Sequence, residues 1–231
     1  MSFIQKINSL YQDKYKYSTF YERLLYLNSK EEDLFRNNNF LSSYVSADIS
    51  TNDKEPIVCI AGKIRVDLPI WFGKENAKNR IMILGSEPRD TNCKYNIEHQ
   101  GKYVFGTPFA IEDWPKNKYF KAFEPIVTSP DTFVYFNDVV KEYYVGNDGK
   151  TNDDRTARKL FWERAQDHRN FLEKEIDIIE PNYIIALGNV VNDFFQKSLS
   201  KYCNKVIKVR HPSRGGSKVA RQSIEKLVST I

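Results

Sequence analysis

The sequence predicts an α/β fold in three layers (α/β/α), with helices on both faces of a central, mostly parallel sheet of four strands. Two observations support this prediction. Short and almost wholly apolar runs, two of them ending in glycine, recur between residues 80 and 209, and such runs are typical of strands buried on both faces. Segments with helical periodicity alternate with these runs, which is the pattern of a parallel sheet covered by helices.

Four runs are expected to form the sheet, and the last of them is more polar and so nearer an edge. They are residues 80–85, 132–136, 183–188 and 205–209. A long helix is expected between the second and the third run, and two shorter helices follow. They are residues 155–178, 189–199 and 217–228.

The first 55 residues differ from the rest and are expected to form a helical extension. Amphipathic patterns at 3–12 and 17–30 predict two helices, a short acidic segment follows at 31–35, and the stretch 46–55 is polar. Such a short segment cannot build its own core. We therefore expect one domain over residues 1–231, with an α/β core at 56–231 that opens on a hairpin at 56–66.

Composition excludes several classes of protein. No apolar run approaches the roughly 20 residues that span a bilayer, and the N-terminus lacks the pattern of a secretory signal. The three cysteines lie far apart, and the three histidines do not stand at metal-ligand spacing. We expect a cytoplasmic monomer with no membrane partner, no disulfide framework, no bound metal and no cofactor.

The charge distribution says more than the net charge of +5. Basic residues dominate the segment 197–226, where Glu225 is the single acid, whereas acids dominate the segment 173–180. This split favours a molecule with one end facing an anion. The alternative is a solvated basic face that has no partner.

Polar side chains follow three of the predicted strands. Glu87 stands in the turn Gly-Ser-Glu-Pro after the first strand, Asn137 follows the second, and His211 opens His-Pro-Ser after the last. In open parallel sheets, ligands bind beyond the carboxyl ends of the strands. We therefore expect Glu87, Asn137 and His211 to meet around a space the size of a pyrimidine.

In order and in spacing, these stretches resemble the motifs of the uracil-DNA glycosylase superfamily. Members carry a G-x-D-P turn after the first core strand, an aromatic residue that stacks on the base, an asparagine after a hydrophobic strand, and an H-P-S turn near the C-terminus. The corresponding stretches here are 85–88, 106–109, 134–137 and 211–213. The resemblance covers about the last two thirds of the chain.

The resemblance implies an enzyme of base-excision DNA repair that hydrolyses the N-glycosidic bond of uracil or a related damaged base without a cofactor. Glu87 would then stabilise the positively charged sugar and activate water, and His211 would donate a hydrogen bond to the base oxygen on which charge develops. The alternatives are that Glu87 caps a turn or a helix and that His211 is structural.

The resemblance also assigns the residues that bind the substrate. The Asn137 amide would read the edge of a flipped pyrimidine, Phe109 would stack on the base, and Ser86 would offer its backbone N–H. Ser213 either binds a DNA phosphate or caps the following helix. The alternatives are a turn residue for Asn137 and a core residue for Phe109.

Two departures from the superfamily bear on the substrate. Arg89 stands where the best-known branch has a tyrosine that excludes thymine, so Arg89 is expected to hold a phosphate or a charged substrate. Arg214-Gly215-Gly216 replaces the part of the turn that carries a wedging leucine, and Arg214 is left to contact phosphate or to insert in its place. Without an apolar wedge, extrusion of a base from duplex DNA is less efficient, so single-stranded DNA is included among the expected partners.

Two further functions stay open at the level of sequence. One is a catalytically silent nucleic-acid-binding protein of the same fold, which the lost wedge favours. The other is hydrolysis of a small nucleoside or nucleotide, which needs no wedge. Cleavage of uracil-containing oligonucleotides, salt-sensitive binding without cleavage, and activity on free nucleosides alone would distinguish the three.

Overall fold

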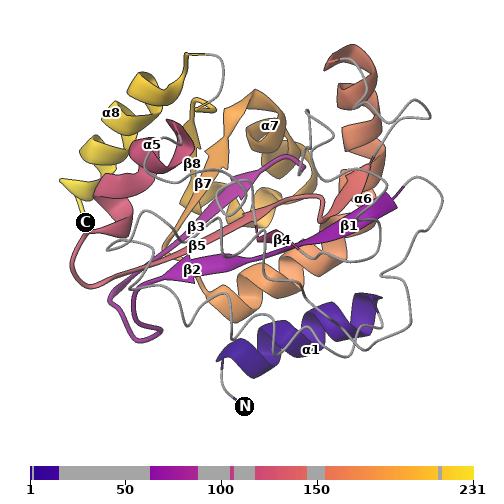
Figure 1. The fold of residues 1–231 in the computed structure, drawn as a ribbon, viewed down its shortest axis with the longest axis horizontal. Coiled ribbons are helices and arrows are strands. Elements are labelled where there is room, and N and C mark those ends of the chain that lie inside the picture. The colour runs from indigo at the N-terminus through magenta and orange to yellow at the C-terminus, as the bar shows by residue number, and fades with distance from the viewer. Residues whose placement is uncertain (2, 16–62, 88–104, 107–117, 145–153, 213–214) are drawn as a thin grey trace.

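The computed structural model describes residues 1, 3–15, 63–87, 105–106, 118–144, 154–212 and 215–231 (Figure 1). The predicted helix at 17–30 and the first half of the predicted hairpin at 56–66 lie outside these residues.

The central sheet has five strands in the order β2-β5-β3-β7-β8. Their bounds are Ile70–Phe72 for β2, Thr132–Asp138 for β5, Asn79–Gly85 for β3, Tyr183–Leu187 for β7 and Val206–Val209 for β8. The four strands β5, β3, β7 and β8 pair in parallel, as predicted. The fifth strand, β2, was not predicted, because it has three residues; it pairs antiparallel with β5 at the edge.

A second, smaller sheet has the order β4-β1-β6. Its strands are Lys63–Leu68 for β1, Phe105–Gly106 for β4 and Glu142–Tyr144 for β6. Strand β1 pairs in parallel with β4 and antiparallel with β6. Because β6 follows β5 closely in the chain, the small sheet adjoins the carboxyl end of β5 (Figure 1).

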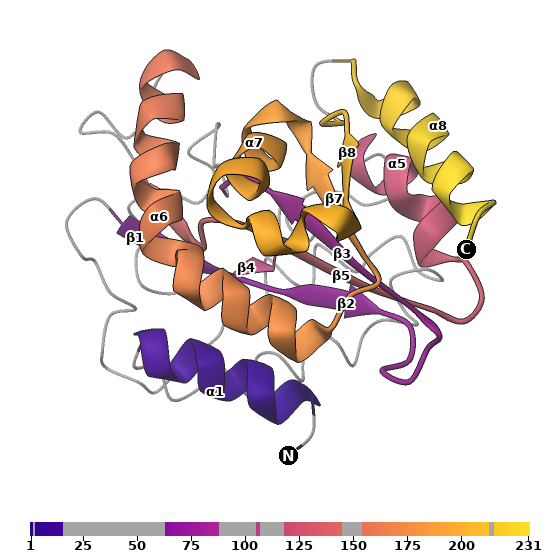
Figure 2. The ribbon, with the colours of Figure 1, turned by 180° about the vertical axis from the view of Figure 1, so that it is seen from behind.

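Helices cover both faces of the central sheet. The described helices are α1 (Phe3–Tyr15), α5 (Lys118–Val127), α6 (Asp154–Ile179), α7 (Gly188–Ser198), the 3-10 helix η4 (Ser200–Lys205) and α8 (Ser217–Val228). Helices α1, α6 and α7 lie on one face and α5 and α8 on the other (Figures 1 and 2). This arrangement confirms the predicted three-layer α/β/α fold. None of the described helices is both long and apolar enough to cross a bilayer.

Helix α5 was missed by the sequence prediction because a proline lies inside it. Pro125 has no N–H, so it cannot donate to the carbonyl of Lys121 one turn earlier. Arg221 of α8 replaces that donor, with Nη1 at 2.8 Å from the Lys121 carbonyl oxygen. The carbonyl that Pro125 leaves without a helical donor is therefore used for a hydrogen bond between α5 and α8.

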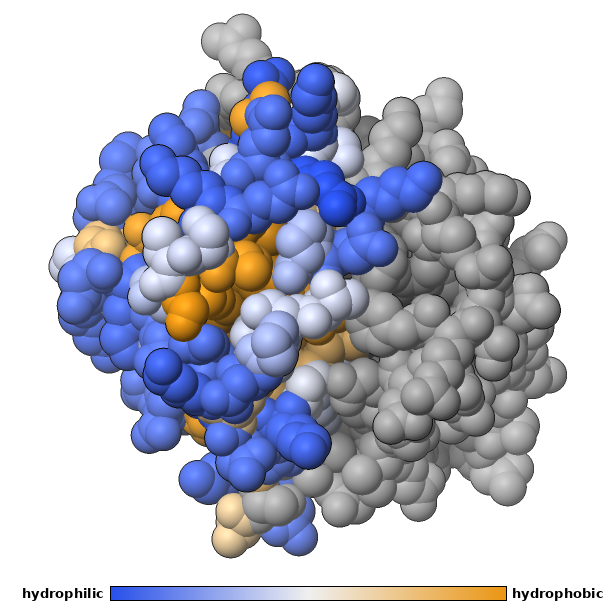
Figure 3. Space-filling view, turned by 90° about the vertical axis from the view of Figure 1, so that its left-hand side faces the viewer, coloured by the Kyte–Doolittle hydropathy of each residue, from blue (hydrophilic) through white to orange (hydrophobic). Residues whose placement is uncertain are grey.

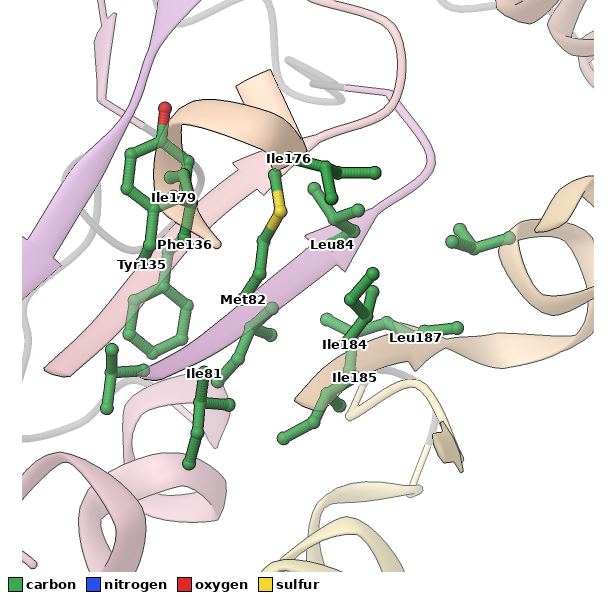
Figure 4. Packing of buried hydrophobic residues seen from close by; sticks show 14 of the residues in the cluster. Ile81, Met82, Leu84, Tyr135, Phe136, Ile176, Ile179, Ile184, Ile185 and Leu187 are labelled. Atoms are coloured by element: carbon green, nitrogen blue, oxygen red, sulfur yellow. The ribbon is translucent and has the colours of Figure 1, made fainter. Parts of the chain in front are cut away.

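The core fills both sides of the sheet, because successive strand residues point to opposite faces. Figure 4 shows Met82 and Leu84 on the side of Ile176, which belongs to α6, whereas Ile81 and Ile185 point to the side of α5 and α8. All of these side chains are at most 2% exposed. Strand β3 lies in the middle of the sheet and is buried on both faces. Its packing therefore fixes the position of the turn that follows it.

Candidate active site

The carboxyl ends of the parallel strands meet at one edge of the sheet. The register pairs Gly85 at the end of β3 with Asp138 at the end of β5, and Leu187 at the end of β7 with Val209 at the end of β8. Backbone bonds extend the pairing of β3 and β5 into the following turns, with the Val139 N–H donating to the Gly85 carbonyl at 2.9 Å. The turns after these strands are therefore fixed neighbours, as the sequence predicted.

Glu87 lies two residues beyond β3 and is held by an arginine that the sequence analysis did not single out. Arg164 of α6 places Nη1 at 3.1 Å from Glu87 Oε2. The Glu87 side chain is 6% exposed and that of Arg164 is 15% exposed. In a charge pair so shielded from water, the attraction offsets the lost hydration only when the geometry of the pair is good. The contact with Arg164 therefore favours one orientation of the predicted catalytic carboxylate.

His211 lies beside the junction of β7 and α7. Its Cβ would be 3.6 Å from a Cβ added to Gly188, the first residue of α7. Gly188 has φ of +86°, a conformation that glycine adopts without strain. His211 is partly exposed. Since β7 lies between β3 and β8 in the sheet, Glu87 and His211 flank the carboxyl end of β7.

Asn137 has protein partners for both ends of its amide. Its Nδ2 donates to the Tyr11 hydroxyl at 2.6 Å and to Glu175 Oε1 at 2.7 Å, and its Oδ1 accepts from the Asp138 N–H at 2.8 Å. The residue is 2% exposed. The bonds to Tyr11 and Glu175 hold the Asn137 side chain on the face of the sheet that α1 and α6 cover. They would have to break before the amide could bind the edge of a base.

The partners of Asn137 belong to a buried polar network centred on Glu175 of α6. Glu175 Oε1 also accepts from Tyr135 at 2.6 Å and from Tyr11 at 3.2 Å, and Oε2 pairs with Lys141 Nζ at 2.7 Å. The side chains of Glu175 and Lys141 are both fully buried. Burial raises the pKa of Tyr135 well above its usual range, and the neighbouring charge of Glu175 raises that pKa further. The network joins α1 and α6 to the carboxyl end of β5.

The remaining predicted site residues are mostly outside the described part of the chain. Arg89, Phe109, Ser213 and Arg214 all lie there. Ser86 is described, and its carbonyl accepts from the Val140 N–H at 3.0 Å. Within the described ranges, no three His, Cys, Asp or Glu side chains gather in a way that could hold a metal ion.

Three residues at this edge were missed by reasoning from the sequence. Arg164 and Glu175 lie on a helix whose charged residues resemble an ordinary solvated face. Their partners are distant in the chain, with Arg164 77 positions from Glu87. Asp138 was visible as the second residue of an Asn-Asp pair. The alternation of strand side chains could have indicated that Asn137 and Asp138 point to opposite faces.

The basic segment predicted to face an anion, residues 197–226, reaches this edge in its middle part, around the end of β8 and the start of α8. Lys208, Arg210 and Lys218 are exposed, and none forms an ion pair with another described residue. Farther from the edge, Lys201 pairs with Glu173 and Arg221 with Glu124 and Glu225. Figure 3 shows the side of the molecule that carries α5 and α8, where hydrophilic residues surround a smaller hydrophobic area. Positive charge is thus available beside the ends of β8 and the start of α8.

The structure is that of an α/β/α protein whose parallel strands end at one common edge. The model of the uracil DNA glycosylase superfamily matches residues 72–223, more than half of the chain. The match includes Glu87, Asn137 and His211. The chain belongs to the uracil DNA glycosylase superfamily. A search of the curated proteins found no match.

Proposed function

We propose that this protein is a DNA glycosylase that hydrolyses the N-glycosidic bond of uracil or a related damaged base in DNA. The observation that carries the proposal is the position of Glu87 and His211, on either side of the carboxyl end of β7 in a chain of this superfamily. One group is an acid suited to the sugar and the other is a hydrogen-bond donor suited to the base.

In the proposed reaction, the bond between C1′ of the deoxyribose and the base nitrogen breaks, and its electron pair leaves with the base. Positive charge develops on the sugar, and the Glu87 carboxylate stabilises it. A water oxygen bonds to C1′ and its proton passes to Glu87, which releases it to solvent. The products are an abasic site and the free base.

Arg164 has a positioning role in this scheme. Its Nη1 lies 3.1 Å from Oε2 of Glu87 and so fixes the orientation in which the carboxylate meets the sugar and the water. Holding a reacting group within a fraction of an ångström of its working geometry contributes strongly to rate. The ion pair thus orients the carboxylate at the edge of the sheet.

His211 acts at the other end of the breaking bond. The leaving pyrimidine carries negative charge on its exocyclic carbonyl oxygen, and a hydrogen bond from the imidazole stabilises that charge. His211 is partly exposed, so a base bound at this edge can reach it. The proton that the base finally needs comes from solvent or from the imidazole.

The test is cleavage of oligonucleotides that carry a single uracil, in single-stranded and double-stranded form, with alkali to break the chain at the abasic product. We expect release of the base by the wild type and a loss of about 100-fold or more in Glu87→Gln and in His211→Ala. Glu173→Gln is the matched control, since Glu173 is an ion-paired acid of α6 on the surface. Cleavage that survives in both site variants would overturn the proposed roles.

A nucleic-acid-binding protein without catalysis is the second candidate. It is favoured by the sequence Arg214-Gly215-Gly216 in place of an apolar wedge and by the ion pair that engages Glu87 in this structure. Salt-sensitive binding of the same oligonucleotides, with no abasic product from any lesion, would support it over the glycosylase.

A further inference from the structure

We infer that Lys141 and Glu175 form a positioning pair, which fixes the turn that carries the Glu87 carboxylate. This role rests on the proposed function, because it concerns the acid of that reaction. Neither residue of the pair contacts the substrate in this scheme. They act through main-chain hydrogen bonds between the turn after β5 and the turn after β3. Glu87 is then fixed twice, by its backbone and by the contact of its side chain with Arg164.

Two hydrogen bonds join the turn after β5 to the turn after β3. The Val139 N–H donates to the Gly85 carbonyl at 2.9 Å. The Val140 N–H donates to the Ser86 carbonyl at 3.0 Å, and Ser86 directly precedes Glu87 in the chain. Val139 and Val140 are completely buried, so close packing restricts the turn after β5. The backbone that leads into Glu87 is therefore held by this turn.

The ends of β3 and β5 also lie so close together that only glycine fits at the end of β3. The register of the sheet pairs Gly85 with Asp138. A Cβ added to Gly85 would overlap the side chain of Asp138. Displacing the turn after β5 would therefore displace the end of β3 as well, because no gap between them absorbs the movement.

Lys141 closes the turn after β5 and ties it to α6. Its Nζ donates to the carbonyl of Asp138, three residues earlier, and pairs with Glu175 Oε2 at 2.7 Å. The side chains of Lys141 and Glu175 are both fully buried. The ammonium group also lies 5.8 Å from the centre of the ring of Phe171, another residue of α6. A buried charge cannot leave its partner without a large cost in free energy, so the turn stays attached to the helix.

The same helix holds the side chain of Glu87. Arg164 places Nη1 at 3.1 Å from Glu87 Oε2. Arg164 and Glu175 are 11 positions apart on α6, which is close to three helical turns of about 3.6 residues each, so both project from one side of the helix. The side chain and the backbone of the acid are thus fixed relative to one rigid element. A reacting group keeps its working geometry under this condition.

The test removes both charges of the pair and keeps the volume. Lys141→Met combined with Glu175→Gln leaves no unpaired buried charge, and glutamine retains an acceptor for the Tyr135 hydroxyl. We expect kcat for base release to fall by roughly 10-fold or more with little change in KM, because a misplaced acid affects the transition state more than binding. Arg80→Met, at the opposite end of β3, is the matched control and should keep the wild-type kcat. Urea unfolding defines conditions in which each variant is folded.

A third substitution shows whether the pair acts on the same carboxylate as Arg164. Arg164→Gln removes the other contact that fixes Glu87. Because an acid that is already misplaced loses little more, the loss of kcat in the triple variant should fall short of the product of the separate losses. A loss equal to that product, or larger, would mean that the pair acts elsewhere and would contradict its role in positioning Glu87.

Hydrogen exchange examines the same contacts without catalysis. In the double variant, the Val139 and Val140 amides should lose protection by about 10-fold or more, whereas the Ile185 amide in the neighbouring strand β7 keeps its protection. Unchanged protection of Val139 and Val140 would show that the pair does not hold the turn.

The two measurements separate this role from the proposed function. If the wild type releases a base and the folded double variant retains the wild-type kcat, the positioning role is overturned while the glycosylase activity stands. If the wild type releases no base from any lesion, the glycosylase proposal fails. The exchange of the Val139 and Val140 amides then still decides whether Lys141 and Glu175 fix the turn that leads to Glu87.

Discussion

The two ends of the same parallel strands use their polar side chains in different ways. At the amino end, Arg80 Nε donates to the Ile179 carbonyl at 2.6 Å, and Asn182 Oδ1 accepts from the Arg80 N–H at 2.7 Å. Asp131 Oδ1 accepts from the Lys78 N–H at 3.1 Å. Each of these side chains is hydrogen-bonded to main-chain atoms. Such a bond can break only if the strand or helix that supplies the main-chain atom unfolds.

At the carboxyl end, polar side chains bind other side chains as well, although Asn137 and Lys141 also bind the main chain of Asp138. Glu87 pairs with Arg164, and Glu175 binds Lys141 and Asn137. Partners of this kind come from separate elements and can be exchanged for a substrate or rearranged around one. The comparison indicates that the polar side chains at the amino end stabilise the fold, whereas those at the carboxyl end surround the proposed site.

The largest effect on stability is expected at the centre of the supporting network. Glu175→Ala leaves the fully buried Lys141 without its carboxylate. Removing one partner of a buried pair leaves an uncompensated charge, so the free energy of unfolding should fall by about 3–5 kcal/mol. Urea unfolding at neutral pH measures the change.

A double variant separates the charge from the packing. Glu175→Leu combined with Lys141→Met removes both charges and keeps apolar volume, so it should be more stable than Glu175→Ala. A loss below about 1 kcal/mol in Glu175→Ala would mean that water reaches Lys141, contrary to its burial here.

The second prediction concerns Arg164, which acts through Glu87. Arg164→Gln should lower the rate of base release by about 10- to 100-fold, because the carboxylate loses the contact that orients it. The fall should appear in kcat with little change in KM, and Arg164→Lys should restore part of it. Arg169→Gln, at an exposed ion pair one turn farther along α6, is the control. Equal loss of kcat in both variants would contradict a positioning role.

The sequence was sufficient to predict the main elements of the fold. Apolar runs located β3, β5 and β7, because strands buried on both faces cannot alternate with polar residues. Strand β8 was located as a more polar run nearer an edge, which is where the structure has it. Helix α8 was predicted with the bounds that the structure has. Strand β2 was missed because three residues carry too little periodicity, and α5 because Pro125 interrupts its pattern.

The site was harder to predict, because pairing across the fold decides it. The turns with Glu87 and His211 could be located at strand ends, since the carboxyl edge is a general consequence of parallel pairing. From the sequence, Asn137 alone was given a role at the end of β5, whereas packing against α1 and α6 determines the face of the sheet on which its side chain lies. The pair of Glu87 with Arg164 depends on how α6 crosses the sheet, which no local pattern records.

The third prediction is made at the amino end of the strands. Arg80→Met removes hydrogen bonds to the carbonyls of Ile179 and Glu75 and the contact of the guanidinium with Phe133. The free energy of unfolding should fall by about 1–3 kcal/mol. Base release at saturating substrate should not change in the folded variant. A loss of activity larger than the loss of folded protein would contradict the division between the two ends.

The fourth prediction is a dependence of stability on alkaline pH. The pKa of Tyr135 is raised, chiefly by burial, so above a pH of about 10 an unfolded chain gives up this proton before the native chain does. The native state then binds more protons than the unfolded state, and stability falls as the pH rises. Below that range the protonated hydroxyl retains its hydrogen bond to Glu175 at 2.6 Å.

Tyr135→Phe should reveal this contribution. The variant should be less stable than the wild type by about 1 kcal/mol at neutral pH, and the two should converge as the pH rises above 10. Tyr183→Phe, which removes a partly exposed hydroxyl from β7, is the control and should run parallel to the wild type. Parallel curves for Tyr135→Phe as well would refute the linkage.

The smallest effect is expected at Gly188, beside His211. Gly188→Ala places a side chain at φ of +86°, which costs about 1 kcal/mol for an L-residue. Its new Cβ would lie 3.6 Å from His211 Cβ, an ordinary contact that leaves the imidazole in place. Gly215→Ala is the matched control, because Gly215 has φ of +80° and no atom within 4 Å of an added Cβ. We expect equal losses of stability, measured by urea unfolding, and unchanged base release in both. A loss of base release in Gly188→Ala alone would mean that His211 has no room to move at this edge. The position of His211, like that of Asp138 beside Gly85, would then depend on a glycine.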